Sequence, residues 1–495
     1  MSRRRVVVVG AGNAALCAAL AAREAGAEVT VVEAAPPAEH GGNSAYTAGA
    51  MRVAYDGVDD LLQLMPDLTG EQLAKTEFGS YPRSAFLDDM ARVTEYRCDP
   101  ELTDVLVSRS LATLRWMRGQ GVRFLPSYGR QAFVVDGRFT FWGGLAVEVS
   151  GGGQGLIETL FTQAARQGID IRHEHRATGL IETDGQVRGV VVRHQGRRTE
   201  LPADAVVLGS GGFQANAEWR TRYLGPGWDL AKVRGTRFNI GDGIAMALAA
   251  GAMPFGNWSG CHAVGWDLNA PAFGNLAVGD GYQKHSYPLG IMVNAAGERF
   301  VDEGADFRNY TYAKYGREIL AQPGQFAWQV FDDKVTGLLR DEYRIKEASR
   351  VTAGSLEELA GRLEGVDPAG FLRTVRDYNA AVTATVPFNP NVKDGRRADL
   401  AVPKSNWASL LDTPPYSAYA VTCGITFTFG GLRITADGAV IDVGGRVIDG
   451  LFACGELVGG LFFFNYPGGS GLTAGAVFGR IAGTSAAGGP APQAS

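Results

Sequence analysis

Apolar runs and glycine turns alternate in the first part of the chain. Residues 6–9 are four consecutive valines, which is typical of a strand buried on both faces of a parallel sheet. A glycine-containing turn follows, then a helical pattern over residues 16–25 and a second apolar run over residues 28–33. This order predicts a β-α-β unit at the start of an α/β domain.

Similar patterns recur along the rest of the chain, and the composition changes in one stretch. Strand patterns occur at residues 169–181, 187–194 and 205–209, and helical patterns at 102–118, 356–363 and 369–383. Between residues 236 and 349 aromatic residues become more frequent, and we interpret this stretch as an inserted domain. The predicted organisation is a Rossmann-like domain made of residues 1–235 and 350–488, an inserted α+β domain of residues 236–349, and a disordered tail of residues 489–495.

Length and charge limit the classes of function. The chain has 495 residues, of which 45% are hydrophobic and 20% charged, as in a globular protein of two domains. Its net charge of −5 argues against nucleic acid or an anionic membrane surface as the main partner. No stretch approaches the roughly 18 to 20 apolar residues of a membrane span, and the apolar run near the N-terminus is too short for a signal peptide. We therefore expect a cytoplasmic protein without a membrane span.

The cysteine and glycine contents add two constraints. The five cysteines, at positions 17, 98, 261, 423 and 454, form no CxxC pair and no CxxCH haem site. This pattern indicates a reducing compartment and predicts no iron–sulfur cluster, structural zinc or other metal. Glycine is unusually frequent, with 68 residues, which indicates tight turns and close approach of the backbone to a ligand.

The turn after the first strand carries the first candidate chemistry. It reads Gly10-x-Gly12-x-x-Ala15, and Glu33 ends the second strand. Gly10 allows the tight turn, Gly12 lets a pyrophosphate approach the helix N-terminus, and Ala15 allows helix and strand to pack closely. Glu33 can accept hydrogen bonds from ribose hydroxyls. The motif favours a dinucleotide site over an ordinary strand-to-helix turn.

Two further segments favour FAD over NAD as that dinucleotide. The loop at residues 41–44 (GGNS) follows the second strand closely and suits contact with a pyrophosphate or a flavin. Residues 447–456 form a strand that runs into Gly-Glu, and in FAD-binding Rossmann proteins such a late strand returns beside the first one. The helix that follows begins with small residues. Its free amide groups would face the flavin pyrimidine carbonyl and stabilise negative charge on the reduced ring.

Segments along nearly the whole chain resemble one flavoprotein family. They are GAGNAA (10–15), GGNS (41–44), VVLGSGGFQAN (206–216), NIGDGIAMALAAGA (239–252), GERFVDE (297–303) and LFACGELVGG (451–460). In this order they are similar to fumarate reductases, succinate dehydrogenases and 3-ketosteroid Δ1-dehydrogenases. The C-terminal piece ACGELVGGLFFFNYPGGSGLTAGAVFGRIAG most resembles the tricarballylate dehydrogenase branch. The resemblance implies an α/β, Rossmann-like FAD-binding domain with an inserted capping domain, and a substrate held between them against the flavin.

The resemblance also implies which residues hold the cofactor. Matching positions assign FAD contacts to Gly10, Gly12, Asn13, Ala14, Ala15, Glu33, Gly41, Gly42, Asn43, Ser44, Gly49, Ala177, Gly211, Gly212, Asn239, Asp242, Gly455, Glu456, Gly471 and Leu472. In succinate dehydrogenases a histidine tethers the flavin covalently, but it aligns near Ser44 rather than with His40. We therefore expect FAD to be bound non-covalently.

Three residues match catalytic or substrate-binding positions of the family. Arg308 follows GERFVDE with one extra residue of spacing and corresponds to the arginine that transfers a proton in fumarate reductases. His262 corresponds to a histidine that binds a substrate carboxylate. Tyr466 stands where the reductases have a substrate-binding arginine, and residues 426–430 (TFTFG) replace a His-x-x-Gly-Gly type segment. A tyrosine before Pro-Gly-Gly resembles the ketosteroid dehydrogenases, in which the hydroxyl polarises a substrate carbonyl.

Several of these polar residues also have simpler interpretations. Arg308 could be a surface arginine paired with Asp306, and His262 could be a core histidine whose hydrogen bonds are satisfied. Lys284 and His285 are adjacent and could bind an anion, but a solvated loop explains them more simply.

The aromatic residues near these positions leave similar choices. One of Tyr310, Tyr312 and Tyr315 could supply a catalytic phenol. Residues 462–464 are three consecutive phenylalanines that could line or seal the cavity beside the flavin, although at least two of them suit an ordinary core equally well.

The favoured interpretation is an FAD-dependent dehydrogenase that desaturates a carbon–carbon bond next to a carboxyl or carbonyl group, as in the conversion of tricarballylate to cis-aconitate. A base would remove the acidified α proton while the β hydrogen leaves as hydride to flavin N5. Arg308 would carry the proton within a relay, because arginine alone is a poor base near neutral pH. His262 and Tyr466 would bind the activating group.

Two alternatives remain open. The first is the same chemistry on a ketone or enone in steroid-like or secondary metabolism, since carboxylate ligands of the reductases are replaced here. The second is an electron-transfer flavoprotein without small-molecule turnover of its own. The sequence carries no haem or cluster motif, so in each case we expect an external electron acceptor or redox partner.

Overall fold

Two six-stranded sheets form the centre of the computed structural model, which describes residues 3–490. The first sheet has the strand order β22-β23-β13-β1-β2-β9. Its strands are β1 Arg5–Val9, β2 Glu28–Val32, β9 Asp170–Arg172, β13 Ala205–Leu208, β22 Ala439–Ile441 and β23 Val447–Ala453. Neighbouring strands are parallel except at the edge, where β22 runs antiparallel to β23.

The β-α-β unit predicted at the N-terminus is present. β1 and β2 are parallel neighbours with Val6 opposite Val29, and helix α1 (Asn13–Glu24) connects them. The four valines at residues 6–9 are all buried, as expected for a strand inside a parallel sheet.

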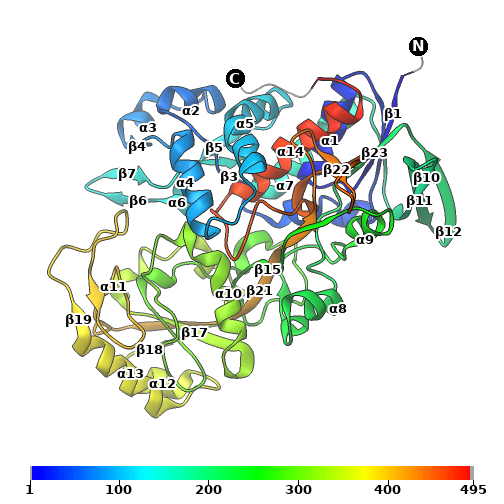
Figure 1. Cartoon of the computed structure of the whole chain (residues 1–495). Helices are drawn as coiled ribbons and strands as arrows, with labels where there is room; N and C mark the ends of the chain where they lie inside the picture. Colours follow the sequence, from blue (N-terminus) through cyan, green and yellow to red (C-terminus); the bar gives the residue numbers. More distant parts are fainter. Residues whose placement is uncertain (1–2, 491–495) are drawn as a thin grey trace.

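Small residues let α14 (Ser470–Ala486) pack directly on α1, so that the first and the last helix of the chain lie side by side (Figure 1). A Cβ atom at Gly479 would lie 2.4 Å from the backbone oxygen of Ala14. One at Gly483 would lie 2.0 Å from the backbone oxygen of Ala18. Any side chain at these positions would push the helices apart, so the glycines of α14 serve helix packing as well as the site at its N-terminus.

The late strand does not return beside the first strand, which corrects the prediction from sequence. β23 pairs with β13, with Leu451 opposite Val206, and β13 in turn pairs with β1. β13 is apolar throughout and fully buried, so it takes the central position next to β1. The C-terminal strand therefore lies one position further from β1.

The second sheet is built around one long strand, β21 (Tyr416–Leu432). β14, β15, β17 and β18 all pair with it, and β16 pairs with β17. Their bounds are β14 Lys232–Val233, β15 Pro254–Asp267, β16 Ile291–Val293, β17 Phe326–Phe331 and β18 Arg350–Ala353. β21 runs back toward the first sheet, where Leu432 forms a bridge with Val458 (Figure 1).

This second sheet continues beyond residue 349, where the sequence pattern placed the end of the inserted domain. β18 and β21 belong to it, and α12 (Leu356–Arg362) and α13 (Pro368–Ala381) share its core through Leu359 and Phe371. A helical pattern predicts a helix but not the sheet that the helix covers, so the return to the first domain could not be located from it. The second sheet and its core extend to Leu432.

The remaining elements surround these two sheets. The other strands are β3 Ala50–Met51, β4 Thr76–Glu77, β5 Phe124–Pro126, β6 Ala132–Val135, β7 Arg138–Phe141, β8 Val147–Val149, β10 Arg176–Thr183, β11 Gln186–His194, β12 Arg197–Pro202, β19 Val382–Thr383 and β20 Arg397–Ala398. The other helices are α2 Val58–Leu64, α3 Gly70–Ala74, α4 Arg83–Val93, α5 Pro100–Gly119, α6 Tyr128–Gln131, α7 Gly152–Arg166, α8 Ala217–Trp219, α9 Asp242–Ala249, α10 Tyr312–Leu320 and α11 Asp333–Thr336. Within residues 3–490, no helix is both long and apolar enough to cross a membrane. The predicted tail lies outside the described residues from residue 491 onward.

Candidate active site

A groove beside the first strand-to-helix turn gathers most of the predicted cofactor residues. We call this space, of about 110 Å³, the N-terminal groove. The predicted residues that line it are Gly10, Gly12, Asn13, Ala14, Glu33, Gly42, Asn43, Ser44, Ala177, Gly211, Asn239, Asp242 and Glu456.

Backbone conformation shapes this groove. Gly10 has a φ of 103°, and a Cβ atom there would lie 2.6 Å from the carbonyl oxygen of Gly209, so only glycine fits the turn. At the start of α1, the amide of Asn13 donates to Oγ of Ser44 over 3.1 Å. This hydrogen bond ties the loop at residues 41–44 to the N-terminus of the helix.

Glu33 lies in the wall of the groove, at the end of β2. Its carboxylate accepts hydrogen bonds from the amides of Ala11 (2.7 Å) and Ala35 (2.8 Å). Burial raises the pKa of Glu33, and the backbone hydrogen bonds act in the opposite direction. Each carboxylate oxygen has more than one lone pair, so Glu33 keeps the capacity to accept from ribose hydroxyls.

The groove fits the dinucleotide that the sequence predicted. The hydroxyl of Ser210 in its wall is buried and has no hydrogen-bond partner among the described residues. Backbone close to the groove excludes side chains, since a Cβ atom at Gly211 would lie 2.3 Å from Nδ2 of Asn239. An exposed strip of backbone at a helix N-terminus is the environment in which pyrophosphates bind.

Four predicted cofactor residues do not line the groove or the larger cavity described next. Ala15 packs against Gly209, so closely that a Cβ atom at Gly209 would lie 2.9 Å from Cβ of Ala15. Gly41 faces Ile157, Gly49 faces Gly152, and Gly212 faces the side chains of Glu456 and Thr428. These residues do not face either space, but they allow the segments that form the walls to pack closely together.

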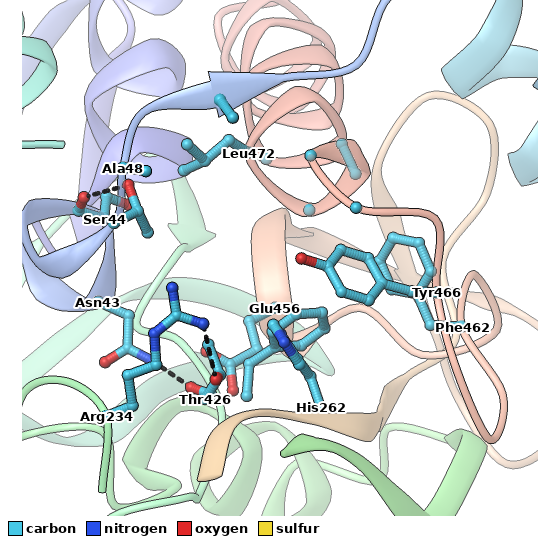
Figure 2. A pocket seen from close by; sticks show the side chains of 18 of the residues that line it. Asn43, Ser44, Ala48, Arg234, His262, Thr426, Glu456, Phe462, Tyr466 and Leu472 are labelled. Atoms are coloured by element: carbon cyan, nitrogen blue, oxygen red, sulfur yellow. Dashed lines mark hydrogen bonds between the residues drawn. The ribbon is translucent and has the colours of Figure 1, made fainter. Parts of the chain in front are cut away.

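A larger cavity adjoins the groove, between the first turn of α14 and the second sheet. We call this space, of about 190 Å³, the central cavity. Asn13, Asn43, Ser44 and Glu456 line both spaces, which are therefore contiguous. Figure 2 shows Ser44 and Leu472 on one side of the cavity and Glu456 on the other. The remaining predicted residues in its wall are Gly455, Gly471, Leu472, His262, Arg308 and Tyr466.

His262 projects into the central cavity from β15. Neither of its ring nitrogens has a hydrogen-bond partner among the described residues, so the interpretation as a satisfied core histidine is wrong. Its ring lies 4.7 Å from that of Tyr466 and 5.0 Å from that of Tyr312, between centroids. Burial lowers the pKa of His262 well below its ordinary value, so the ring is neutral near pH 7 and offers one donor and one acceptor.

Tyr466 faces the same cavity and is paired with a second phenol. Its hydroxyl forms a hydrogen bond with the hydroxyl of Tyr312, and both side chains are buried. Burial raises the pKa of both tyrosines, so each hydroxyl keeps its proton. Of the three candidate tyrosines, Tyr312 is the one that lines the cavity, since the hydroxyl of Tyr310 bonds to Asp89 and that of Tyr315 to the backbone of Asp302.

Arg308 lines the central cavity and is not paired with Asp306. Its Nη1 lies 3.2 Å from Nδ1 of His285, and its Nη2 donates to the backbone oxygen of Arg130 over 2.5 Å. The Nε atom is buried without a partner among the described residues. Burial lowers the pKa of Arg308, and Asp306 pairs instead with Arg92 at 2.7 Å.

The segment with Lys284 and His285 is not a solvated loop, which corrects the simpler interpretation. Both side chains are fully buried, and Nζ of Lys284 lies 3.5 Å from Oδ2 of Asp267. His285 lines the central cavity, and its Nε2 has no partner among the described residues. Burial, and to a smaller extent repulsion from Arg308, lowers the pKa of His285 well below its ordinary value.

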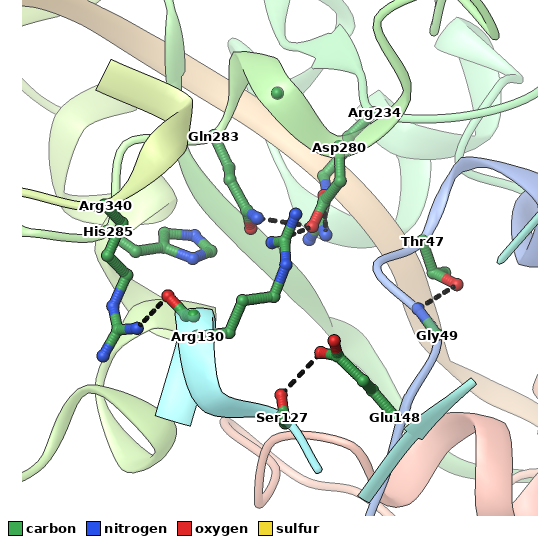
Figure 3. A network of polar contacts seen from close by, with 12 residues as sticks. Thr47, Gly49, Ser127, Arg130, Glu148, Arg234, Asp280, Gln283, His285 and Arg340 are labelled. Atoms are coloured by element: carbon green, nitrogen blue, oxygen red, sulfur yellow. Dashed lines mark hydrogen bonds and ion pairs between the residues drawn. The ribbon is translucent and has the colours of Figure 1, made fainter. Parts of the chain in front are cut away.

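Two arginines and an aspartate in the central cavity were missed by the sequence analysis. Nη1 of Arg130 lies 3.0 Å from Oδ2 of Asp280, and Nε of Arg234 donates to Oδ1 of Asp280 over 2.9 Å (Figure 3). Nη1 of Arg234 also donates to Oγ1 of Thr426 at 3.3 Å. Arg130 and Asp280 are 150 positions apart along the chain, so no local sequence signal indicates that they meet.

Only one of the three consecutive phenylalanines lines the central cavity. Phe462 does so, with its ring 5.4 Å from that of Tyr466. Phe463 and Phe464 are half-buried outside it, and Arg97 lies over the ring of Phe464. Of the three phenylalanines, Phe462 alone therefore contributes an apolar side chain to the cavity wall.

Comparisons with known proteins agree with this geometry. A sequence family described as FAD binding domain matches residues 5–472. A probable fumarate reductase of Shewanella frigidimarina (strain NCIMB 400) is 31% identical over 494 residues, covering 98% of this chain and 74% of that protein. The solved structure of the open conformation of a flavocytochrome c3 fumarate reductase superposes with a TM-score of 0.71 at 29% identity, covering 98% of this chain and 78% of that one. A 3-ketosteroid Δ1-dehydrogenase from Sterolibacterium denitrificans shares the fold, with a TM-score of 0.74 at 21% identity and coverage of 98% and 99%.

Proposed function

We propose, from the premise that this chain belongs to the FAD-binding family that includes the fumarate reductases, that it desaturates a carbon–carbon bond next to a carboxylate, as in the conversion of tricarballylate to cis-aconitate. Family membership makes the protein an FAD-dependent oxidoreductase that acts on CH–CH groups, and it confirms the cofactor and the fold class predicted from sequence. The proposal concerns the substrate and the residues that act on it.

Positive charge in the central cavity is the observation that carries this proposal. Arg130, Arg234 and Arg308 line the cavity together with two carboxyl groups, those of Asp280 and Glu456. Asp280 is already paired with two of the arginines. Burial raises the pKa of Glu456 to about 7, so it is partly protonated near neutral pH. The remaining positive charge favours a carboxylate substrate over a neutral one.

The relatives support an acid as substrate. Several are named for fumarate, acrylate or urocanate, each of which is an unsaturated carboxylate, whereas a vinyl phenol reductase and a 3-oxosteroid dehydrogenase are named for neutral compounds. Such a reductase works on the same kind of bond as a desaturase, in the opposite direction.

The residues of this chain that would hold the flavin lie in both spaces. Glu33 and the glycine turn of the N-terminal groove would hold the adenosine and pyrophosphate parts, and the first turn of α14 would lie beside the ring. When bound, FAD supplies the two-electron chemistry by accepting the hydrogen of the β carbon as hydride.

Side chains of the protein would then bind the acid and transfer its α proton. Neutral His262 and the hydroxyl of Tyr466 would donate hydrogen bonds to the carboxylate next to the reacting bond, which acidifies the α proton. Arg308 would act within a relay: one of its N–H groups passes a proton to Nδ1 of His285, which is 3.2 Å from Nη1, and the guanidine nitrogen freed in this way takes the α proton. Burial lowers the pKa of Arg308, and a lower pKa eases the release of a proton from its guanidinium.

A specific observation favours a second candidate, the dehydrogenation of a ketone. The paired hydroxyls of Tyr466 and Tyr312 could polarise a carbonyl oxygen, and a 3-oxosteroid 1-dehydrogenase of Mycobacterium tuberculosis is 28% identical over 370 residues. A neutral ketone, however, would not balance the positive charge of the guanidiniums in the same cavity. We therefore rank it second.

Anaerobic reduction of the bound flavin separates the two candidates. The purified holoenzyme is mixed with tricarballylate, succinate or a 3-ketosteroid, and the flavin absorbance is followed. Bleaching by tricarballylate, with cis-aconitate as product, is the expected result. Bleaching by the ketosteroid alone would reject the carboxylate proposal. We expect reoxidation to need an external acceptor, which a second mixing step with quinones and dyes would identify.

A further inference from the structure

Arg130 offers free hydrogen-bond donors at the edge of the central cavity, and its side chain has no part in the proposed proton transfer. We propose that Arg130, held in place by Asp280, binds a second carboxylate of the substrate and so makes the site select acids with two or more carboxylates. This inference deepens the proposed function and rests on it for the reaction itself.

Asp280, which lines the same cavity, fixes the guanidinium of Arg130. Oδ2 of Asp280 lies 3.0 Å from Nη1 of Arg130, and it also accepts a hydrogen bond from Nε2 of Gln283. Oδ1 of Asp280 accepts from Arg234, 2.9 Å from its Nε. The aspartate is only 4% exposed and is compensated by two cations, so it cannot neutralise Arg130 fully.

A count of donors distinguishes the two arginines. Arg234 uses Nε and Nη2 on Asp280 and Nη1 on Thr426, so three of its donor atoms are engaged. The side chain of Arg130 donates to Asp280 alone among the described residues, through Nη1. A guanidinium carries five N–H donors in a planar fork, so Arg130 retains the edge formed by Nε and Nη2. That edge matches the two oxygens of a carboxylate.

The position of Arg130 suits the far end of a small acid. Its side chain is 31% exposed and lines both the central cavity and an adjoining space of about 320 Å³. Thr47, Ala48 and Asp280 also line both spaces. Its backbone oxygen accepts the Nη2 hydrogen bond of Arg308. The backbone of Arg130 thus contacts the proposed proton carrier, while its partly exposed side chain borders the adjoining space.

Carboxylates near this positive end are shared with other arginines. Glu342 acts on Arg308 and Arg340 as well as on Arg130, and Asp341 pairs with Arg344 at 3.0 Å. Glu148 lines the adjoining space, but its carboxylate accepts a hydrogen bond from Oγ of Ser127 at 2.6 Å, and burial raises its pKa. Arg340 adds a further positive charge nearby, with Nη1 donating to the backbone oxygen of Gly129 at 2.7 Å. Figure 3 shows Arg130, Arg340 and His285 close together on this side of the cavity.

Binding titrations of the holoenzyme test the inference without relying on turnover. Perturbation of the flavin spectrum is measured with tricarballylate, succinate and propionate for the wild type, Arg130→Gln and Arg130→Lys. We expect Arg130→Gln to weaken the binding of tricarballylate and succinate by about 10- to 100-fold and to leave that of propionate within about twofold. Arg130→Lys keeps the charge but not the fork, so we expect an intermediate loss.

Controls separate a specific effect from a structural one. Arg123→Gln removes an exposed arginine of the same region, 65% exposed and paired with Asp67, and should change no affinity. Arg130→Lys retains a cation for Asp280, so it provides the comparison if Arg130→Gln loses its flavin. Equal weakening for all three acids, or no weakening for any, would overturn the inference. If the wild type binds the diacids in this Arg130-dependent way but no acid reduces its flavin, the reaction proposed above fails and the second carboxylate site stands.

Discussion

Turns and glycines shape the N-terminal groove, whereas long polar side chains project into the central cavity among apolar ones. In the groove, Gly10 exposes backbone, and the carboxylate of Glu33 already accepts hydrogen bonds from the chain. In the central cavity, His262 has two unpartnered nitrogens, and the amide of Asn309 and Nε of Arg308 are buried without partners among the described residues.

This difference indicates what each space is built to bind. Buried polar groups without partners are costly in a folded protein, about 1–3 kcal/mol each. Their accumulation in the central cavity is therefore explained best by a polar ligand that completes their hydrogen bonds. The groove carries one such group, the hydroxyl of Ser210, and otherwise presents a fixed shape for a single ligand.

Substitution in the turn of the groove should have the largest effect, because it removes the cofactor. Gly10→Ala would place Cβ 2.6 Å from the backbone oxygen of Gly209, and we expect protein that is purified without flavin. Gly26→Ala is the matched control, since Gly26 has a similar φ of 93° but no atom within 4 Å of its Cβ position. It should cost about 1 kcal/mol of stability and retain the yellow colour. Flavin absorbance per protein measures the difference, and a yellow Gly10→Ala protein would contradict the assignment of the groove.

Substitution of Arg308 should break the reaction in the central cavity and leave the groove intact. Arg308→Ala removes the proposed proton carrier, so we expect turnover to fall by about 10²- to 10⁴-fold with flavin content unchanged. Arg92→Ala is the control, because Arg92 pairs with Asp306, the partner that the sequence offered for Arg308. Stopped-flow reduction of the flavin gives both rates. Wild-type reduction in Arg308→Ala would reject the assignment.

The paired phenols should show a smaller effect. Tyr466→Phe and Tyr312→Phe each remove one hydroxyl of the same hydrogen bond, and we expect each to lower kcat/KM by about 10-fold. Because the two groups act together, the double variant should lose much less than the product of the single losses. Fully multiplicative losses would mean that the hydroxyls act independently.

The same contrast explains how much could be predicted from sequence. The groove residues lie in short motifs around Gly10 and Glu33, where turn chemistry and strand patterns are local, so the groove and its dinucleotide were found. Arg308, His262 and Tyr466 were found only through resemblance to a family. The structure places all three in the central cavity.

Long-range contacts set the limit of the prediction. Arg130, Arg234 and Asp280 come from segments far apart in the chain, and nothing in their neighbours marks them. The extent of the second sheet was missed for the same reason, since β21 pairs with strands on both sides of residue 349. Burial of His285 likewise depends on tertiary packing and not on the composition of its loop.

Glu456 lines both spaces, and its titration should have the smallest of the predicted effects, a dependence of folding stability on pH. Its carboxylate accepts from the amide of Thr428 (2.9 Å) and from Nε2 of Gln214 (3.2 Å), yet burial raises its pKa from 4.5 to about 7. The folded form thus holds the proton more tightly than the unfolded form, so folding stability is lost as the pH rises from 4.5 through 7. The loss is at most roughly 3 kcal/mol, since each pKa unit corresponds to about 1.4 kcal/mol.

Thermal unfolding of the flavin-free protein measures this contribution of Glu456. We expect Tm of the wild type to fall by several degrees more than that of Glu456→Gln between pH 5 and pH 8, because glutamine carries no proton to lose. Glu200→Gln, at an exposed position of β12, should follow the wild type. Parallel pH profiles for the wild type and Glu456→Gln would mean that this carboxyl is solvated at the junction of the two spaces. The charge balance of the central cavity would then include one more full negative charge, and the preference for a polycarboxylate would rest on Arg130 and Arg308 alone.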